Sequence, residues 1–209
     1  MAIKDYDELN SLELDTLKEI GSIGTGNAAT ALSSLIGQEV RIQLPEVRIM
    51  GYNEAIEWIG GPEEITAGVL VKMSGQVNGI MLAVQQLEFV NLVLESMLGK
   101  GVDDYVGLHE MENSALIEVG NIMISTFINA LSDLAGISID LTVPAFTVDM
   151  QGAIMAVPMA EYGGQSDYIM TIGGNFVCNG KEVPCRLLLS PDIRSLNFLL
   201  RKLGVSGGE

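Results

Sequence analysis

Three polar residues of types that do chemistry stand at helical spacing in the second half of the chain. Ser114, Glu118 and Asn121 lie at positions i, i+4 and i+7, so a helix would gather them within about 60° of one another on one face. Neither Asn121 nor Glu118 is an obvious nucleophile, and the patch lacks the ligands that would hold a metal ion. The asparagine amide offers one acceptor and two donors, so it can orient a water molecule. Such a face could hardly hydrolyse a stable ester by itself.

The same arrangement occurs 99 residues earlier, where the equivalent positions hold Asp15, Glu19 and Ser22. Each polar face lies opposite an apolar stripe whose steps of 3, 4, 4, 3 and 4 residues are typical of an amphipathic helix. The stripes consist of Leu17, Ile20, Gly24, Ala28, Ala31 and Leu35 in the first copy and of Leu116, Val119, Met123, Phe127, Ala130 and Leu134 in the second. A polar residue on a helix is usually only solvated. Two polar faces at equivalent positions of the two copies favour the interpretation that these residues have a function.

The duplication continues beyond the predicted helices. Each helix is expected to end at a glycine, Gly37 or Gly136, and a strand-like run follows at residues 39–42 and 138–141. Pro45 and Pro144 also correspond. Closing helices are predicted at 86–98 and 191–203. Further strands are predicted at 47–51, 65–73 and 79–84 in the first copy and at 147–150, 152–157, 167–178 and 183–189 in the second.

Two copies of this pattern, without the strand–helix alternation of a parallel sheet, predict an α+β fold. The repeats, at about 8–100 and 107–205, are expected to be related by a pseudo-twofold axis and to share one largely antiparallel sheet. Only a short turn at 101–104 joins them, so residues 1–209 are predicted to form one domain. The stretch around Trp58 is expected to be a loop.

Composition excludes several classes of function. With 11 Lys and Arg against 27 Asp and Glu, the net charge is −16. Such a surface repels nucleic-acid backbones and anionic lipid, and it favours partners that expose lysines. The chain begins with acidic residues and has no uninterrupted apolar run of about 18 residues, so we expect a cytoplasmic protein without a signal peptide or membrane insertion.

The thiols and the single histidine point to no metal site. Cys178 and Cys185 flank the turn-forming pair Asn179 and Gly180, so they could face each other across a hairpin. A disulfide is one alternative, and two free thiols are favoured in a reducing cytosol. His109 is the only histidine, so the sequence offers too few Cys and His ligands for a typical zinc site.

The spacing of the polar faces resembles a known signature. The CheC/CheX/FliY phosphatases of bacterial and archaeal chemotaxis carry Asp or Ser, three residues, Glu, two residues, Asn, twenty-two residues and Pro, and the set of Ser114, Glu118, Asn121 and Pro144 matches this pattern in full. The first copy has Ser22 in place of the asparagine. Residues 19–24 and 118–123 also resemble the family's E-I-G-N-I segment.

The resemblance implies a phosphatase of the phosphorylated response regulator CheY. An aspartyl phosphate is an activated acyl phosphate, and the regulator supplies its own Mg²⁺ and lysine, so no cofactor is expected in this chain. The family implies that Asn121 places the attacking water in line with the phosphorus, as the water-positioning glutamine of GTPases does. It also implies that Glu118 pairs with the regulator's lysine, with Ser114 in support.

Two alternatives remain within this resemblance. Two motif copies and no room after Gly204 for an added domain most resemble CheC-type proteins, although a single intact motif also fits a CheX-like phosphatase. The degenerate first face of Asp15, Glu19 and Ser22 is expected to be weak or inactive, which leaves room for a weakly catalytic or non-catalytic adaptor.

A second partner is also implied by the resemblance. CheC proteins bind the receptor deamidase CheD through the region after the second proline. That region contains Asp149, whose counterpart in the first copy is Met50. Asp149 is therefore a candidate partner-binding residue.

Overall fold

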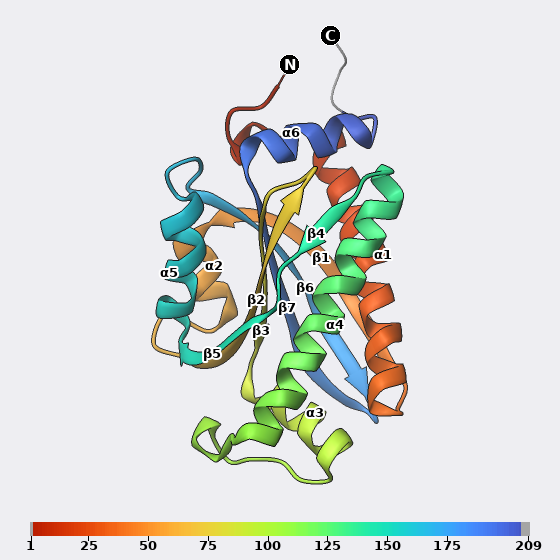
Figure 1. The fold of residues 1–209 in the computed structure, drawn as a ribbon, viewed down its shortest axis with the longest axis vertical. Helices are drawn as coiled ribbons and strands as arrows, with labels where there is room; N and C mark the ends of the chain where they lie inside the picture. The colour runs from red at the N-terminus through yellow and green to blue at the C-terminus, as the bar shows by residue number, and fades with distance from the viewer. Residues whose placement is uncertain (1, 206–209) are drawn as a thin grey trace.

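The two predicted long helices are confirmed. The computed structural model describes residues 2–205, and in it α1 (Ser11–Ile36) lies beside α4 (Glu110–Ala135) on one face of a sheet (Figure 1). Both helices end where predicted, because Gly37 and Gly136 adopt the left-handed conformation at φ 69° and 62°. The apolar stripes face the core over most of their length, but Leu134 is 47% exposed, so the second stripe ends one turn early.

The predicted antiparallel sheet is also confirmed. Over the described residues its strands follow the order β1-β6-β7-β3-β2-β4, with β5 also paired to β2, and every pairing is antiparallel. The strands are β1 (Val40–Gly51), β2 (Ile65–Gly75), β3 (Gly79–Gln85), β4 (Ile139–Leu141), β5 (Ala145–Met150), β6 (Tyr168–Cys178) and β7 (Lys181–Pro191).

The order of the strands interlocks the two repeats. The first strand of the first repeat, β1, pairs with β6 of the second repeat, and β4 and β5 of the second repeat pair with β2 of the first. The central strands β3 and β7 join the two halves. Because each repeat completes the sheet of the other, neither half can be removed without breaking strand pairs.

Helices cover both faces and both ends of the sheet (Figure 1). The larger core lies between the sheet and the long helices, and a smaller one lies under α2 (Tyr52–Ile59) and α5 (Gln151–Tyr162) on the opposite face. The ends are closed by α3 (Leu87–Leu98) and α6 (Ile193–Lys202), as predicted. Short 3-10 turns at Tyr6–Glu8 and Tyr105–Gly107 precede the long helices.

Two predictions about local structure are wrong. Residues 152–157 form part of α5 rather than a strand: Ile154 and Met155 are buried in the smaller core, and Pro158, one helical turn after Ile154, is also buried. The stretch around Trp58 is not a loop but the helix α2. The ring of Trp58 packs against Arg186, whose guanidinium carbon lies 4.3 Å from the ring centroid.

The first strand also differs from expectation. The runs predicted at 39–42 and 47–51 join into the single strand β1, whose pairing with β6 shifts between Gln43 and Glu46. The irregularity lies at Leu44, with a positive φ of 50°, and Pro45. In the second repeat, residues 142–144 separate β4 from β5 instead.

The two cysteines do not face each other. Asn179 and Gly180 form the predicted turn with positive φ angles of 51° and 77°. The register then pairs Cys178 with Lys181, and Cys185 lies opposite Gly174. Both thiols are free and buried. A disulfide across this hairpin is incompatible with that register.

By length and composition, α4 is the one helix in the described part of the chain that could cross a membrane. Its buried side chains pack against α1 and the sheet, and 56% of its most apolar stretch is inside the molecule. Packing in the core therefore accounts for its apolar composition.

We predict opposite effects for alanine at two glycines of α1. A methyl group at Gly24 would lie 2.4 Å from Cδ2 of Phe127, whereas one at Gly26 meets open space. Gly24→Ala should therefore reduce the free energy of unfolding by about 1–3 kcal/mol, and Gly26→Ala should raise it by about 0.5–1 kcal/mol. Urea unfolding of both variants checks the prediction, and equal midpoints would contradict the packing described here.

Candidate active site on the long helices

Both site helices begin in the same way. In α1, the side chain of Asn10 accepts a hydrogen bond from the Glu13 N–H at 3.1 Å, and the Glu13 carboxylate accepts one from the Asn10 N–H at 3.0 Å. In α4, the Glu112 carboxylate accepts from the His109 N–H at 3.2 Å. Since these pairs are 99 residues apart, equivalent caps start the two helices in the same register.

The cap of α4 is also tied to the end of the first repeat. Lys100 Nζ lies 2.8 Å from Glu112 Oε1, and the side chain of Glu112 is only 5% exposed. The hydrogen bond from Lys100, followed by that from its own backbone N–H, lowers the pKa of Glu112 to about 2. This buried carboxylate therefore stays ionised and holds the start of α4 against the segment that precedes it.

The polar face of α4 has the geometry that its spacing predicts. Ser114 and Glu118 are exposed and Asn121 is half-buried, while Leu116 and Val119 between them are fully buried. The three polar side chains therefore share one outward face, and the residues between them fix the helix to the core.

The internal hydrogen bonds of this face distinguish its members. Ser114 Oγ donates to the Glu110 carbonyl at 2.7 Å, so the hydroxyl bonds its own helix rather than Glu118. Within residues 2–205, neither the Glu118 carboxylate nor the Asn121 amide has a hydrogen-bond or ion-pair partner. Both groups are available to another molecule.

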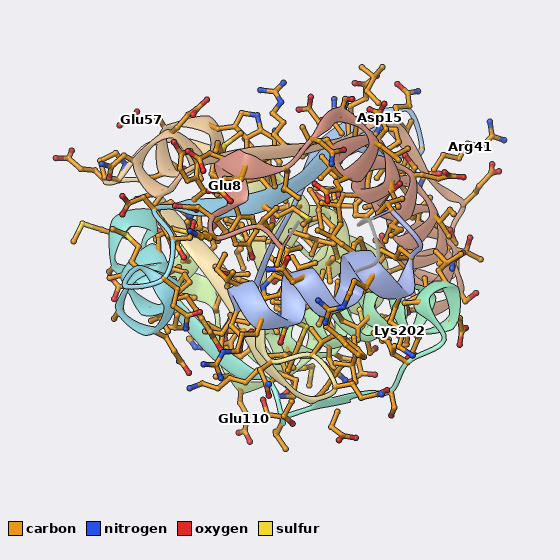
Figure 2. All side chains as sticks on the ribbon, turned by 90° about the horizontal axis from the view of Figure 1, so that it is seen from above. Glu8, Asp15, Arg41, Glu57, Glu110 and Lys202 are labelled. Atoms are coloured by element: carbon orange, nitrogen blue, oxygen red, sulfur yellow. The ribbon has the colours of Figure 1, made fainter. Side chains whose placement is uncertain are left out.

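The first face, on α1, differs in two ways. Asp15, Glu19 and Ser22 are all exposed, and Asp15 lies at the rim of the molecule seen from above (Figure 2). Its carboxylate forms an ion pair with Lys18 Nζ at 3.0 Å. The position of Lys18 is held by Ile117 in the second copy. The first face therefore lacks the asparagine and carries a cation that the second face does not.

Neither proline lies on the long helices. Pro45 stands at the irregularity within β1, and Pro144 immediately precedes β5. Phe146, two residues after Pro144, is paired with Val69 of β2. The motif therefore joins a helix face to the adjoining edge of the sheet.

Asp149 lies on the other side of the sheet from α4. Alternation along β5 directs Phe146 to the larger core, and it directs Thr147 and Asp149 toward α5. There Asp149 is exposed at the rim of a cavity of about 320 Å³ lined by apolar residues of β2 and α5, among them Leu70 and Ile154. Its carboxylate accepts a hydrogen bond from the Met150 N–H at 2.7 Å.

No group of three or more His, Cys, Asp or Glu side chains that could hold a metal ion occurs among the described residues. The sequence analysis included Gly21 and Gly120 in the two motif segments but gave them no role, and in the structure both lie against the sheet. Their repetition at matched positions was the available signal.

Comparison with known proteins finds a family that both repeats of the chain match. The model of the CheC-like family matches residues 12–49 and 111–148, segments that contain both polar faces and both prolines. The CheY-P phosphatase CheC of Bacillus subtilis (strain 168) is 24% identical over 205 residues, which cover 96% of this chain and 98% of that protein. Both repeats of the chain therefore match the CheC-like family, and the chain is a homologue of that CheC.

Solved structures with the same fold confirm the predicted fold class of this CheC-like chain. The crystal structure of Thermotoga maritima FliY matches with a TM-score of 0.72 and 22% identity, covering 94% of this chain and 98% of that one. A chain in the crystal structure of the CheX-CheY-BeF3-Mg complex from Borrelia burgdorferi matches with a TM-score of 0.54 and 18% identity, covering 86% of this chain and 99% of that one.

The cap of α4 predicts a pH dependence of stability. Because folding lowers the pKa of Glu112 from 4.5 to about 2, its contribution is present above pH 4.5 and is lost as the pH falls toward 2. Lys100→Gln should raise that pKa, so it should destabilise the protein most at neutral pH and progressively less below pH 4.5.

A matched control tests the same charge change at an exposed pair. Lys181 Nζ lies 3.0 Å from Glu95, which is 49% exposed, so Lys181→Gln should have little effect at any pH. Urea unfolding of the two variants and the parent between pH 7 and pH 3 is the measurement. Equal losses for both variants, or a loss at Lys100 that does not change with pH, would refute the role of the Glu112 pair.

Proposed function

We propose that this CheC-like chain hydrolyses the aspartyl phosphate of a CheY-type response regulator at the face of α4 that carries Ser114, Glu118 and Asn121. The observation that carries the proposal is that Glu118 and Asn121 are presented on one helix face with no internal partner. Homology to the CheY-P phosphatase CheC of B. subtilis supports the reaction. The CheX–CheY complex supports a CheY-type partner.

The reaction needs positioning more than it needs a nucleophile. A water oxygen attacks the phosphorus, the bond from phosphorus to the carboxylate oxygen breaks, and the aspartate leaves as a carboxylate while the water proton goes to the released phosphate. The acyl phosphate is already activated, and the regulator supplies Mg²⁺ and a lysine. What remains for this chain is to hold the water in line.

Asn121 has the chemistry for that task. Its amide oxygen can accept a hydrogen bond from the attacking water, and its NH₂ group can donate one to a phosphoryl oxygen. The residue is half-buried between Gly120, which is buried, and Ile122, which is half-buried. Its backbone is therefore fixed, and only the side chain has to meet the regulator.

Glu118 has the chemistry for docking. It precedes Asn121 by three residues and lies on the same face, so its carboxylate can form an ion pair with the regulator's lysine while the amide reaches the phosphoryl group. The net charge of −16 favours the approach of a basic group. In this proposal Ser114 supports the turn through its bond to the Glu110 carbonyl.

The first face is proposed to be weak. The hydroxyl of Ser22 is shorter than an asparagine side chain and has one donor where the amide has two. Lys18, paired with Asp15, also places a positive charge where the regulator's lysine would approach. This face can contribute to binding more readily than to hydrolysis.

We predict that Asn121→Ala removes nearly all phosphatase activity. Misplacing the water by about 1 Å costs on the order of 10²-fold in rate, or about 2.7 kcal/mol. The measurement is the half-life of the phosphorylated regulator under single-turnover conditions. In the Asn121→Ala background, Ser22→Asn should restore a measurable part of the rate, and adding Lys18→Ile should restore more. Full activity of Asn121→Ala would refute the assignment.

A second proposed role is the binding of CheD through Asp149. The supporting observation is its position, exposed beside an apolar cavity on the opposite side of the sheet from the α4 face. A protein bound there and a regulator bound on α4 do not compete for the same surface. Both partners would be met in the cytoplasm, where phosphorylated regulators act.

These two surfaces predict reciprocal defects. Glu118→Lys should weaken binding of the phosphorylated regulator by about tenfold or more, because it sets like charge against the regulator's lysine, and it should leave CheD binding intact. Asp149→Ala should weaken CheD binding and leave regulator binding intact. Titration calorimetry of each variant with each partner makes the comparison. A single variant that weakens both partners equally would contradict the separation of the surfaces.

A further inference from the structure

Gly120 lies between Glu118 and Asn121 in the chain and faces the sheet. A methyl group there would lie 2.5 Å from Cγ2 and 2.6 Å from Cβ of Val69 in β2. Val69 is fully buried, and its branched side chain is stiff, so it cannot move aside at low cost. At this turn the backbone of α4 therefore approaches the sheet more closely than any residue with a side chain would allow.

The first repeat makes the same close approach at the equivalent residue. A methyl group at Gly21 would lie 2.2 Å from Cγ2 of Val47 in β1. Val47 follows Pro45 by two residues. In the second repeat the strand residue under the glycine, Val69, is paired with Phe146, which likewise follows its proline by two. In both copies the glycine rests on a pair of strands that contains the proline of the motif or directly follows it.

Glycine at this position destabilises the helix, and the attachment of α4 to the core does not require it. In the interior of a helix, glycine is less favourable than alanine by about 0.8–1 kcal/mol. The larger core already fixes α4 through Leu116, Val119 and Met123, all buried within a few residues of Gly120. The close approach is therefore not needed to hold α4 on the sheet. It sets the distance between this one turn of α4 and β2.

We infer that Gly120 is a positioning residue of the phosphatase site: it fixes the distance between the turn that carries Glu118 and Asn121 and the sheet edge that carries Pro144. This inference rests on the proposed function. A regulator that docks with an interface of about 800 Å² per partner covers more than one helical turn, so it meets the adjoining sheet edge as well. A change in the height of the turn then moves Asn121 relative to the phosphorus.

The test compares alanine at the two equivalent glycines. Each substitution places a methyl group against a buried valine, within 3 Å of three atoms of Val69 at Gly120 but only of Cγ2 of Val47 at Gly21, and both should lower the urea midpoint. Only Gly120→Ala should lower the kcat for hydrolysis of the phosphorylated regulator, by about 10–100-fold with a smaller change in KM. Gly21 lies behind the face that has no asparagine, so Gly21→Ala should keep kcat near that of the parent.

A compensating change tests whether the loss of kcat arises from the contact between Gly120 and Val69. Val69→Gly removes both the methyl groups and the Cβ atom that the new alanine would meet. In the Gly120→Ala/Val69→Gly variant, kcat should return to within about threefold of the Val69→Gly variant alone, as expected for two residues in direct contact. Destabilisation by itself would lower kcat in Gly21→Ala as well, because its methyl group also meets a buried valine.

Each result has one meaning. If Gly120→Ala loses no more kcat than Gly21→Ala, the positioning role is wrong, while inactivity of Asn121→Ala keeps the proposed function. If Asn121→Ala is as active as the parent, the proposed function is wrong and this inference falls with it. If Gly120→Ala does not fold, the double variant decides. Activity near that of Val69→Gly supports the role, and a folded but inactive protein overturns it.

Discussion

The contact between Phe127 of α4 and Gly24 of α1 is the constraint on which both site helices depend. The aromatic ring is 1% exposed and occupies the space that a side chain on α1 would need. This contact lets two helices of 26 residues lie side by side on one face of the sheet. With their inner faces fixed in this way, Glu19 and Glu118 are both left facing outward.

The duplication preserves the ends of the long helices and their close approach to the sheet, while the surfaces diverge. Capping boxes, terminal glycines and the glycines against the sheet recur 99 residues apart. The surfaces differ where Asn121 replaces Ser22 and where Asp149 replaces Met50. Core changes in a packed interior cost several kcal/mol, whereas most surface substitutions cost less than about 0.5 kcal/mol. One repeat could therefore change its outer face while keeping its fold.

Periodicity and spacing predicted the long helices, their ends and the sheet, because each of these depends on a local pattern. Residues 152–157 were mistaken for a strand, since a short apolar run does not distinguish a strand from a buried helix. The internal repeat contained the information that distinguishes the two. Tyr52 and Gln151, the first residues of α2 and α5, are 99 apart, the same register that relates the long helices. Comparing the two copies there would have replaced an ambiguous run with two equivalent helices.

The sequence was enough to predict which residues form the polar face. It was not enough to predict the contacts that fix the positions of those residues. The bond of Ser114 to the Glu110 carbonyl, the ion pair of Lys18 and the contact of Gly120 with Val69 all depend on how side chains meet in space. An open helix face has no walls to hold a substrate, so any accuracy has to come from the backbone beneath it. Under the proposed function, the partner brings the phosphoryl group, the Mg²⁺ and the lysine, and this chain brings a water-orienting amide at a fixed height. Neither the regulator nor this chain has all the groups that hydrolysis needs. Specificity for the phosphorylated regulator therefore follows from the geometry of docking rather than from a substrate pocket.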